Sequence, residues 1–410
     1  MPGAPSHFAQ ELIDEVIDNL HDDPVTLRSF ALASRSCGIR ARKHLHRHLR
    51  IGSTGCGPRM LMSPSKVVRY QKIRHLLDFP PLMNYVRALT ASESLESLDR
   101  NPLSFTRLHS LRLFNLNWNA QNAGARLYVL SQLHRVKSLD LNNVDFECIC
   151  NLVSLLDAFP SLSELNIESC RFKNEDMSGD IQRQINLRRL TMPGDCASDL
   201  LIRWLRTQTV VPVIEELVVP GGTGLASDQP VNELVSIAGS SLRHLRFGFG
   251  WIWPHGHPKP RFDLSSNDQL QTLEVTNILL RSNIVRFKDY AWLPDMLQRN
   301  PSRRLKRTTL HLHYETLSQL DDEGLKKIDE ALGGTAENVN RWRSDWRAGL
   351  EELEFVLWPD RMLDEKRALS EVVDWIEGGM PRAAANGVLK CYYGCTYSAM
   401  WTPVERFSAE

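Results

Sequence analysis

Apolar and variable positions alternate in one short template that recurs through the middle of the chain. The template reads L-x-x-L-x-L, where L is a large apolar residue and x is any residue. Its first position is occupied by Leu108, Val136, Leu162, Leu187, Ile214, Leu242 and Leu270. Successive copies therefore start 25 to 28 residues apart. This alternation predicts short strands with one apolar face, and the constant period predicts a repeat architecture.

Helical patterns lie between these predicted strands. In residues 149–159 and 200–205, apolar residues recur at spacings of three and four, which places them on one face of a helix. A strand and a helix of this size cannot bury their apolar faces alone, so stacked neighbours are expected to share a core. The alternative, a set of unrelated elements in one α/β globule, does not account for the near-equal spacings.

Looser copies extend the pattern in both directions. Residues 86–89 form an earlier copy, and later copies lie around Leu310 and Leu312 and at residues 350–355, at longer spacings. Residues 364–394 then follow a helical pattern and a strand pattern once more. We expect this last segment to form a terminal cap on the array.

The first fifty residues carry a different pattern. One helical stripe contains Leu12, Ile13, Val16, Ile17 and Leu20. Asp23 followed by Pro24 predicts the start of a second helix, with the aspartate as N-cap. The first helix is acidic, whereas a third segment from Arg35 to Arg50 is basic and contains no acid. Three helices of this size bury little by themselves, so either a partner surface or the edge of the repeat array is expected to cover them.

These patterns resemble two known families. Residues 86–360 resemble a leucine-rich-repeat array, although the consensus asparagine after each strand is mostly replaced, for example by Val144 and Cys170. Residues 7–49 resemble an F-box, in the form that many fungal proteins join to leucine-rich repeats. Two positions depart from the F-box pattern, because Ala9 stands in place of its proline and Cys37 in place of its tryptophan.

The resemblance to F-box proteins implies a function in protein degradation. Members of that family dock a Skp-type adaptor within a cullin complex, an SCF-type ubiquitin ligase, and hold a target protein for ubiquitin transfer by other subunits. The residues expected to bind the adaptor are Phe8, Leu12, Val16, Ile17, Leu20, Pro24, Leu27, Leu32 and Ala33. We therefore predict a substrate-recognition subunit, and the alternative is an interaction scaffold with no ubiquitin-ligase link, whose N-terminal helices only cap the array.

The variable residue of each L-x-L triplet points away from the two apolar residues, and in a leucine-rich repeat this is the concave face. The residues expected to bind the target are Arg112, Asp140, Asn166, Arg246, Glu274 and Glu354. Their alternating sign suits one protein partner with complementary charge, and the alternative is an ordinary solvated sheet face. Three tryptophans, Trp251, Trp253 and Trp358, are candidate hot spots for binding, because tryptophan is enriched at such positions in protein interfaces.

Composition excludes several classes of partner. The 410 residues include 49 lysines plus arginines and 49 aspartates plus glutamates, so overall charge favours neither nucleic acid nor an anionic membrane. No secretory signal and no apolar run of membrane-spanning length is visible. The eight cysteines are scattered, which suits a reducing compartment, so the expected location is the cytoplasm or the nucleus. We therefore expect no nucleic-acid partner, although residues 40–50 form a basic run that could contact phosphates.

No constellation typical of catalysis is visible. Histidines cluster at 44–48, 255–257 and 311–313. His311 and His313 could share one face of a strand but have no third ligand at a defined spacing, His44, His46 and His48 fit a solvated basic helix, and His255 and His257 lie in a loop rich in tryptophan, proline and glycine. The glycine-rich segment 221–224 lacks the lysine of a phosphate loop, and no C-x-x-C pair occurs. We expect no enzyme, no metal and no cofactor.

The predicted fold class is α/β, with a three-helix F-box followed by an irregular leucine-rich-repeat solenoid, a curved parallel sheet with outer helices. The predicted domains are a helical module at 1–50, a connecting helical segment at 51–85, the repeat array at 86–360 and a helix-and-strand cap at 361–410.

Overall fold

A computed structural model describes most of the chain, which divides into two compact units, residues 1–181 and 182–410. The described residues are 9–51, 83–92, 105–118, 120–174, 186–192, 196–210, 212–220, 228–248, 262–280, 292–300, 302, 304–314, 322–333, 350–359 and 365–393. Most of the predicted connecting segment 51–85 lies outside these residues.

Unit 1 begins with three short helices, α1 (Gln10–Asn19), α2 (Pro24–Ala33) and α3 (Arg35–Leu45), as the sequence predicts. We call residues 9–45 the helical module. Its core is made of side chains from all three helices, with Ile17, Leu27, Cys37 and Ala41 at the centre and Ile13, Leu20, Phe30, Ala31 and Leu45 packed around them. The module therefore has a core of its own.

The predicted start of α2 is confirmed. The Asp23 side chain accepts hydrogen bonds from the backbone N–H groups of Val25 and Thr26, at 3.0 and 3.1 Å, and Pro24 is the first helical residue. The hydroxyl of Ser34 accepts from the N–H of Cys37 and caps α3 in the same way. Both caps satisfy N–H groups that a helix start leaves without partners.

The third helix ends earlier than predicted, and the repeat sheet begins earlier. Strand β1 (His48–Ile51) pairs in parallel with β2 (Ala88–Ala91), so the placement of His48 on a helix is wrong. Leu49 and Ile51 alternate with polar residues and are buried, and this period of two favours a strand over a helix. The sheet thus contains one strand before the first repeat that the sequence predicts.

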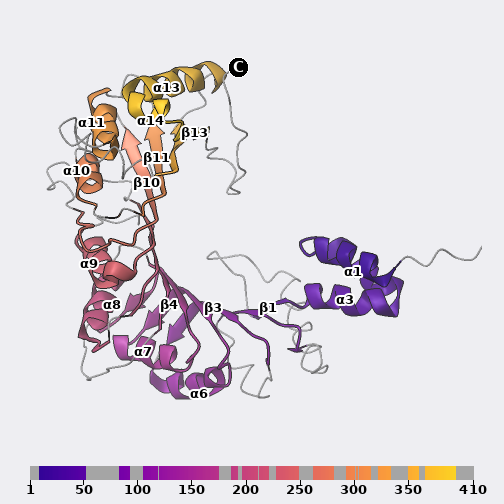
Figure 1. The fold of residues 1–410 in the computed structure, drawn as a ribbon. Coiled ribbons are helices and arrows are strands. Elements are labelled where there is room, and N and C mark those ends of the chain that lie inside the picture. Colours follow the sequence, from indigo (N-terminus) through magenta and orange to yellow (C-terminus); the bar gives the residue numbers. More distant parts are fainter. Residues whose placement is uncertain are drawn as a thin grey trace, which may run out of the picture. The chain divides into compact units, whose positions relative to one another are not determined.

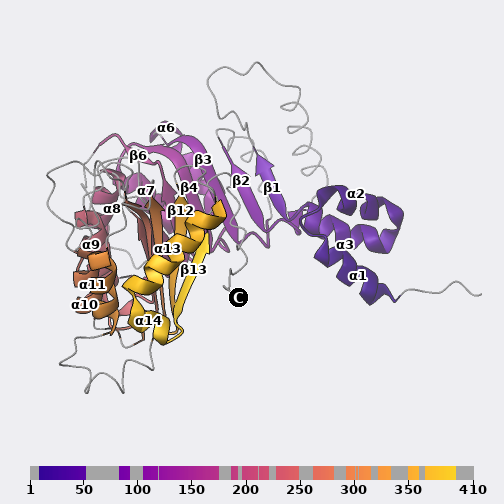
Figure 2. The same cartoon turned by 90° about the horizontal axis from the view of Figure 1, so that it is seen from above.

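The remaining strands of unit 1 follow in chain order. Strand β3 (Ser110–Trp118) pairs with β2 and with β4 (Ser138–Phe146), and β4 pairs with β5 (Glu164–Glu168) and with the short β6 (Arg171–Phe172). All these pairs are parallel. Helices α6 (Ala120–Ser131) and α7 (Ile149–Asp157) follow β3 and β4 and cover one face of the strands (Figures 1 and 2).

Unit 2 repeats the arrangement. Its strands are β7 (Arg189–Thr191), β8 (Glu216–Val219), β9 (His244–Gly248), β10 (Thr272–Leu280), β11 (Arg307–Tyr314), β12 (Glu352–Pro359) and β13 (Leu389–Tyr393). Each pairs in parallel with the next. The helices are α8 (Cys196–Thr207), α9 (Asp228–Ala238), the 3-10 turn η2 (Gly239–Ser241), α10 (Trp292–Arg299), α11 (Asp322–Gly333), α13 (Glu365–Gly379) and α14 (Pro381–Ala385). The predicted terminal helix and strand are α13 and β13.

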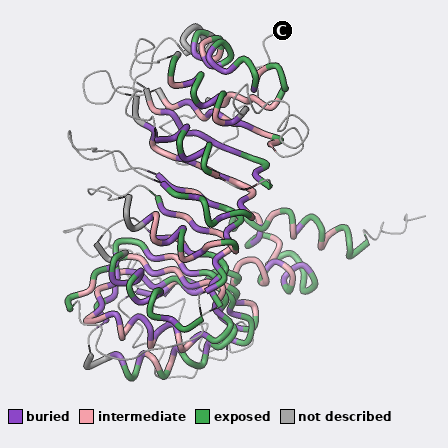
Figure 3. Tube along the Cα trace, turned by 60° about the vertical axis from the view of Figure 1, so that its left-hand side comes forward, coloured by how far each residue is buried: buried purple, intermediate pink, exposed green. Residues whose placement is uncertain are grey.

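The apolar residues of the template occupy matching positions on neighbouring strands. Leu111, Leu139 and Leu165 lie opposite one another on β3, β4 and β5, and all are almost fully buried. Buried and more exposed residues alternate along the strands (Figure 3). The predicted α/β class with parallel strands and one apolar face per strand is confirmed.

The repeat at β11 differs from the predicted register. Leu310 lies opposite Val275 and Phe355, which hold the second apolar position of the triplet, so Leu310 is not the first. The first position is Thr308, which lies opposite Leu273 and Leu353 and is fully buried. Sequence reasoning chose Leu310 and Leu312 because threonine does not match the apolar template.

Four residues at equivalent places in the repeats adopt a left-handed backbone. Asn115, Asn143, Ser169 and Asn277 each follow the last apolar residue of a triplet by two positions and have φ between 53° and 59°. Asparagine tolerates this conformation better than most residues. The amide of Asn143 also donates to the amide oxygen of Asn115 at 2.7 Å, which links adjacent repeats. At the next position Cys170 is buried, with its Sγ 3.7 Å from the carbonyl oxygen of Leu141.

Candidate functional site

The helical module exposes large apolar side chains. Among the described residues, eight large hydrophobic side chains are exposed, and five belong to the module: Leu12, Val16, Val25, Leu32 and Ile39. We call these five the exposed apolar set. The predicted single stripe of α1 divides in two, because Ile13, Ile17 and Leu20 pack into the core while Leu12 and Val16 face solvent. The module thus has a packed core of its own and still exposes apolar side chains to solvent.

The structure sorts the predicted adaptor-binding residues into three groups. Leu12, Val16, Pro24, Leu32 and Ala33 are exposed, Leu20 is half-buried against the core, and Phe8 lies outside the described residues. Ile17 and Leu27 are at most 1% exposed, so we correct their assignment, because a side chain inside the core supports a docking surface without touching a partner.

The exposed apolar set also contains Val25 and Ile39, which the sequence analysis did not single out. Val25 and Leu32 are seven residues apart, about two helical turns, and this spacing on α2 is the signal that could have identified Val25 beside Leu32.

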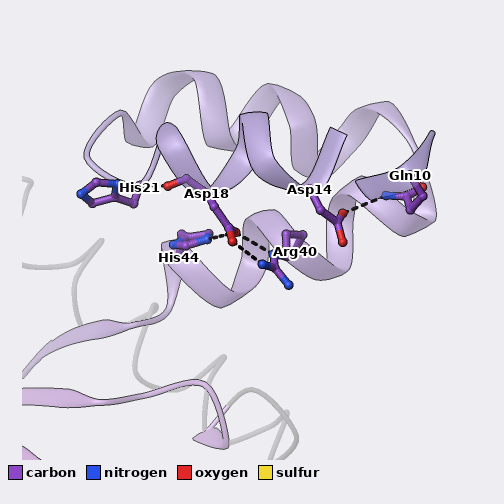
Figure 4. Close-up of polar contacts among 6 residues, drawn as sticks. All are labelled: Gln10, Asp14, Asp18, His21, Arg40 and His44. Carbon is purple, nitrogen blue, oxygen red and sulfur yellow. Dashed lines mark hydrogen bonds and ion pairs between the residues drawn. The ribbon is translucent and has the colours of Figure 1, made fainter. Parts of the chain in front are cut away.

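An ion-pair cluster joins α1 to α3 (Figure 4). The Asp18 carboxylate accepts two hydrogen bonds from the Arg40 guanidinium, one of them from Nε at 2.6 Å, and lies 2.8 Å from Nε2 of His44. The bidentate arginine pair lowers the pKa of Asp18 well below its usual range, and it outweighs the opposing effect of partial burial. The same pairing raises the pKa of Arg40. The acidic first helix and the basic third helix are therefore complementary within the module.

The two departures from the F-box pattern lie in different environments. Cys37 is buried in the module core, where it packs α3, whereas Ala9 is exposed and its carbonyl accepts the first N–H groups of α1. Next to Cys37, Gly38 permits a close helix crossing, because a Cβ there would lie 3.0 Å from the carbonyl oxygen of Ala31. The smaller Cys37 side chain and the missing Cβ of Gly38 both allow α3 to approach α2.

The variable residues of the triplets align in register within each unit, on the face opposite the leucines. In unit 1, Arg112, Asp140 and Asn166 lie opposite one another on β3, β4 and β5. Arg112 forms an ion pair with Asp140, and the Asn166 amide donates to the same carboxylate at 3.0 Å. These predicted target-binding residues are therefore brought together, and they interact with each other.

Unit 2 shows the same pairing of the predicted residues. Arg246 and Glu274 are opposite one another on β9 and β10 and form an ion pair of 3.3 Å. Glu354 accepts a hydrogen bond of 3.0 Å from the Thr309 hydroxyl on the neighbouring strand. The alternating signs that suggested a complementary partner are thus used largely within the sheet.

An aromatic cluster lies beside these residues on β10 to β12. His311 is buried, with Nε2 2.9 Å from the Glu274 carboxylate and Nδ1 accepting from the Trp358 indole N–H at 3.3 Å. Because an indole N–H only donates, Nδ1 of His311 is the acceptor in this contact and Nε2 is the nitrogen that faces the Glu274 carboxylate. Burial raises the pKa of Glu274, but the hydrogen bond from His311 and the charge of Arg246 outweigh it and leave that pKa lowered. His313 stacks on Trp358 with ring centroids 5.7 Å apart.

Several chemical possibilities can be checked against the described part of the chain. There, no group of three or more histidine, cysteine or acidic side chains is arranged to hold a metal ion. Cys37, Cys148, Cys150, Cys170 and Cys391 are free thiols, and burial raises the pKa of Cys391 to about 12. No helix in these ranges has both the length and the apolar composition needed to cross a membrane. Trp251, Trp253 and the histidines at 255–257 lie outside the described residues.

No model of a known protein family matches the chain, and a search of curated proteins finds no match either.

Proposed function

We propose that this chain is a substrate-recognition subunit of an SCF-type ubiquitin ligase. In this proposal the helical module docks a Skp-type adaptor, the repeats hold a target protein, and other subunits of the cullin complex transfer ubiquitin. The chain positions a target and performs no chemistry itself, and it acts in the cytoplasm or the nucleus. The F-box resemblance of residues 7–49 and the repeat pattern supply the argument.

The observation that carries the proposal is the exposed apolar set on a module that already has its own core. Leu32 is 89% exposed and Leu12 53% exposed, although both are large aliphatic side chains. Burying such a side chain against a partner contributes about 1.5–3 kcal/mol, so a partner that covers several of them gains a driving force for association. A module that served only to cap the array would place these side chains against the sheet.

Adaptor capture tests the proposal. The full chain is co-expressed with a Skp-type adaptor and purified through a tag, and the amount of adaptor recovered is measured. We expect the wild-type chain to retain the adaptor and the double variant Leu12→Asp/Leu32→Asp to lose it, because a buried carboxylate without a partner opposes binding. The unfolding midpoint should change little, since both side chains are exposed.

The matched control is Tyr128→Asp on α6, which removes another exposed large side chain, 71% exposed, from outside the module. This variant should retain the adaptor. Failure of the wild-type chain to retain any adaptor, or equal retention by the double variant, would contradict the proposal and leave the interaction scaffold as the better interpretation.

A further inference from the structure

A column of basic residues runs along the amino-terminal edge of the unit 1 strands. One basic residue stands immediately before each of the strands β1 to β4. In strand order these residues are Arg47, Arg87, His109 and Lys137. Their backbones are linked in order: the N–H of Arg87 donates to the carbonyl of Arg47, that of His109 to Arg87 and that of Lys137 to His109, at 2.9, 2.9 and 2.8 Å. We call these four residues the basic column. Strands β1 to β4 lie side by side in Figure 2.

Arg47, Arg87 and Lys137 give the basic column three charges that are not neutralised within the described part of the chain. All four side chains of the column are exposed, and no ion pair joins any of them to an acidic side chain of a described residue. Two more exposed arginines, Arg107 and Arg135, precede β3 and β4 by a few residues. Arg135 donates only to the carbonyl of Thr106, at 3.0 Å, so its charge is also uncompensated.

Unit 2 contains an equivalent column of residues before its strands, but the charges of these residues differ from those of the basic column. The same backbone hydrogen bonds link Arg188, Glu215, Arg243, Gln271, Lys306 and Glu351 in that order. There an acidic or a neutral residue separates each basic residue from the next, and Lys306 forms an ion pair of 2.7 Å with Glu351. Neighbouring strands are about 4.8 Å apart, so like charges in adjacent places repel each other. The basic column of unit 1 therefore opposes folding in a way that unit 2 avoids, and a negatively charged ligand would offset this repulsion.

We propose that the basic column binds an acidic segment of a protein in extended conformation. The inference rests on the proposed function, because it names the chemistry of the target that the repeats would hold. Three strand spacings make the column about 14 Å long, which is the reach of about four residues of extended chain. Carboxylates along such a segment can accept charge-assisted hydrogen bonds from Arg47, Arg87 and Lys137.

A peptide fits this surface better than a nucleic acid does. The basic residues form one row at the sheet edge, whereas the adjoining outward face of the strands carries the exposed acids Glu164 and Glu168 beside the Arg112–Asp140 ion pair. These acids would repel a polyphosphate that spread over the face. The chain as a whole is also neutral, with 49 basic and 49 acidic residues apart from histidine.

Peptide binding to the full chain tests the inference. The probe is a fluorescein-labelled octaglutamate, compared with a neutral glycine–serine octapeptide and with an oligothymidine, in fluorescence anisotropy titrations at low and high salt. We expect octaglutamate alone to bind and its affinity to fall as salt screens the charges. Arg87→Glu/Lys137→Glu should weaken binding by about tenfold or more, because each reversal turns an attraction into a repulsion.

The matched control is Arg188→Glu/Arg243→Glu, which reverses two charges of the unit 2 column and has the same net charge as the test variant. We expect it to change affinity less than about twofold, because these residues alternate with Glu215 and Gln271 and form no basic row. Equal losses in the two double variants, no binding of octaglutamate, or tighter binding of the oligothymidine would each overturn the inference.

Two further measurements separate this inference from the proposed function. The unfolding midpoint of Arg87→Glu/Lys137→Glu should stay or rise, since the reversal makes the column alternate in sign. Adaptor capture by the same variant should equal that of the wild type. Loss of adaptor capture by the wild-type chain contradicts the proposed function, whereas loss of selectivity for octaglutamate contradicts only the acidic target.

Discussion

The helical module and the repeat strands treat apolar residues in opposite ways. In the repeats, each apolar residue of a triplet faces the same position of the next repeat, so Leu111, Leu139 and Leu165 are all at most 1% exposed. In the module, Ile17 and Leu27 are buried, whereas Leu12 and Leu32 remain exposed although each lies only five residues from one of these two. A repeat finds its apolar partner in the adjacent repeat, whereas the module has no adjacent copy.

This difference shows where a partner is needed. Stacking repeats remove apolar surface from water within the chain, and the polar residues of the other face pair with one another, as Arg112 does with Asp140. The module forms a small core and keeps the exposed apolar set. Large apolar side chains gathered in the exposed positions of one small module favour an interaction site, and for this reason the proposed adaptor surface lies in the module and not on the sheet.

The largest expected effect is in the repeat core. Leu165→Ala should lower the free energy of unfolding by about 2–5 kcal/mol, because a cavity remains where the repeats stack. Leu12→Ala is the matched control in the module, and we expect a change within about 0.5 kcal/mol. Urea denaturation of both variants gives the comparison. If both substitutions cost the same, then either the register of β5 or the exposure of α1 is wrong.

A smaller effect is expected at the helix crossing of the module. Alanine favours a helix over glycine by about 1 kcal/mol, but the new Cβ of Gly38→Ala would press on the Ala31 carbonyl, at a cost of about 1–3 kcal/mol. We expect a net loss of about 1 kcal/mol, confined to the module. Hydrogen exchange should show faster exchange of α1 to α3 amides and unchanged protection of β3 and β4. Slower exchange in the helices would mean that the backbone of α2 yields at this contact.

The smallest effect is expected at the ion-pair cluster. Because Arg40 lowers the pKa of Asp18, this pair stabilises the module fully above the ordinary aspartate pKa of 3.8, and the contribution is lost as pH falls from there through the lowered value. Asp18 is partly exposed, so solvent screening limits the contribution to about 1 kcal/mol.

Asp18→Asn should therefore destabilise the module at pH 7 and flatten its stability profile below pH 4, as measured by thermal unfolding at several pH values. The control is Asp14→Asn on the same helix, whose carboxylate accepts from Gln10 only, at 2.8 Å. A profile for Asp18→Asn that still falls in parallel with the wild type below pH 4 would show that the Arg40 pair carries no such stability.

Local signals in the sequence predicted the elements well. Asp23 and Pro24 mark the start of α2, the spacing of apolar residues marks α7 and α8, and the terminal helix and strand are α13 and β13. These predictions hold because a cap or an amphipathic face depends on residues within about two turns of each other. The errors occur where a distant neighbour decides, as at His48, which joins a strand because β2 lies beside it.

The candidate sites were predicted less completely. Residue type and spacing identified Leu12, Val16 and Leu32 as candidates, but they did not separate these residues from Ile17 and Leu27, which the packing of three helices buries. The predicted target-binding residues lie on the expected face of the strands, opposite the leucines, yet their pairing with one another was not predicted. Arg112 and Asp140 are 28 residues apart, and only the register of β3 against β4 joins them.

By itself, the amino-acid sequence determined the period of the repeats, the apolar face of each strand and the start of the helices, because these depend on contacts between near neighbours along the chain. The tertiary structure alone decided which apolar residues of the module stay exposed and which charges meet across strands. Strand register brings together residues 26 to 45 positions apart. It therefore places acidic residues beside basic ones at the strand edge of unit 2, where Lys306 pairs with Glu351, and leaves the basic column of unit 1 without acidic partners among the described residues.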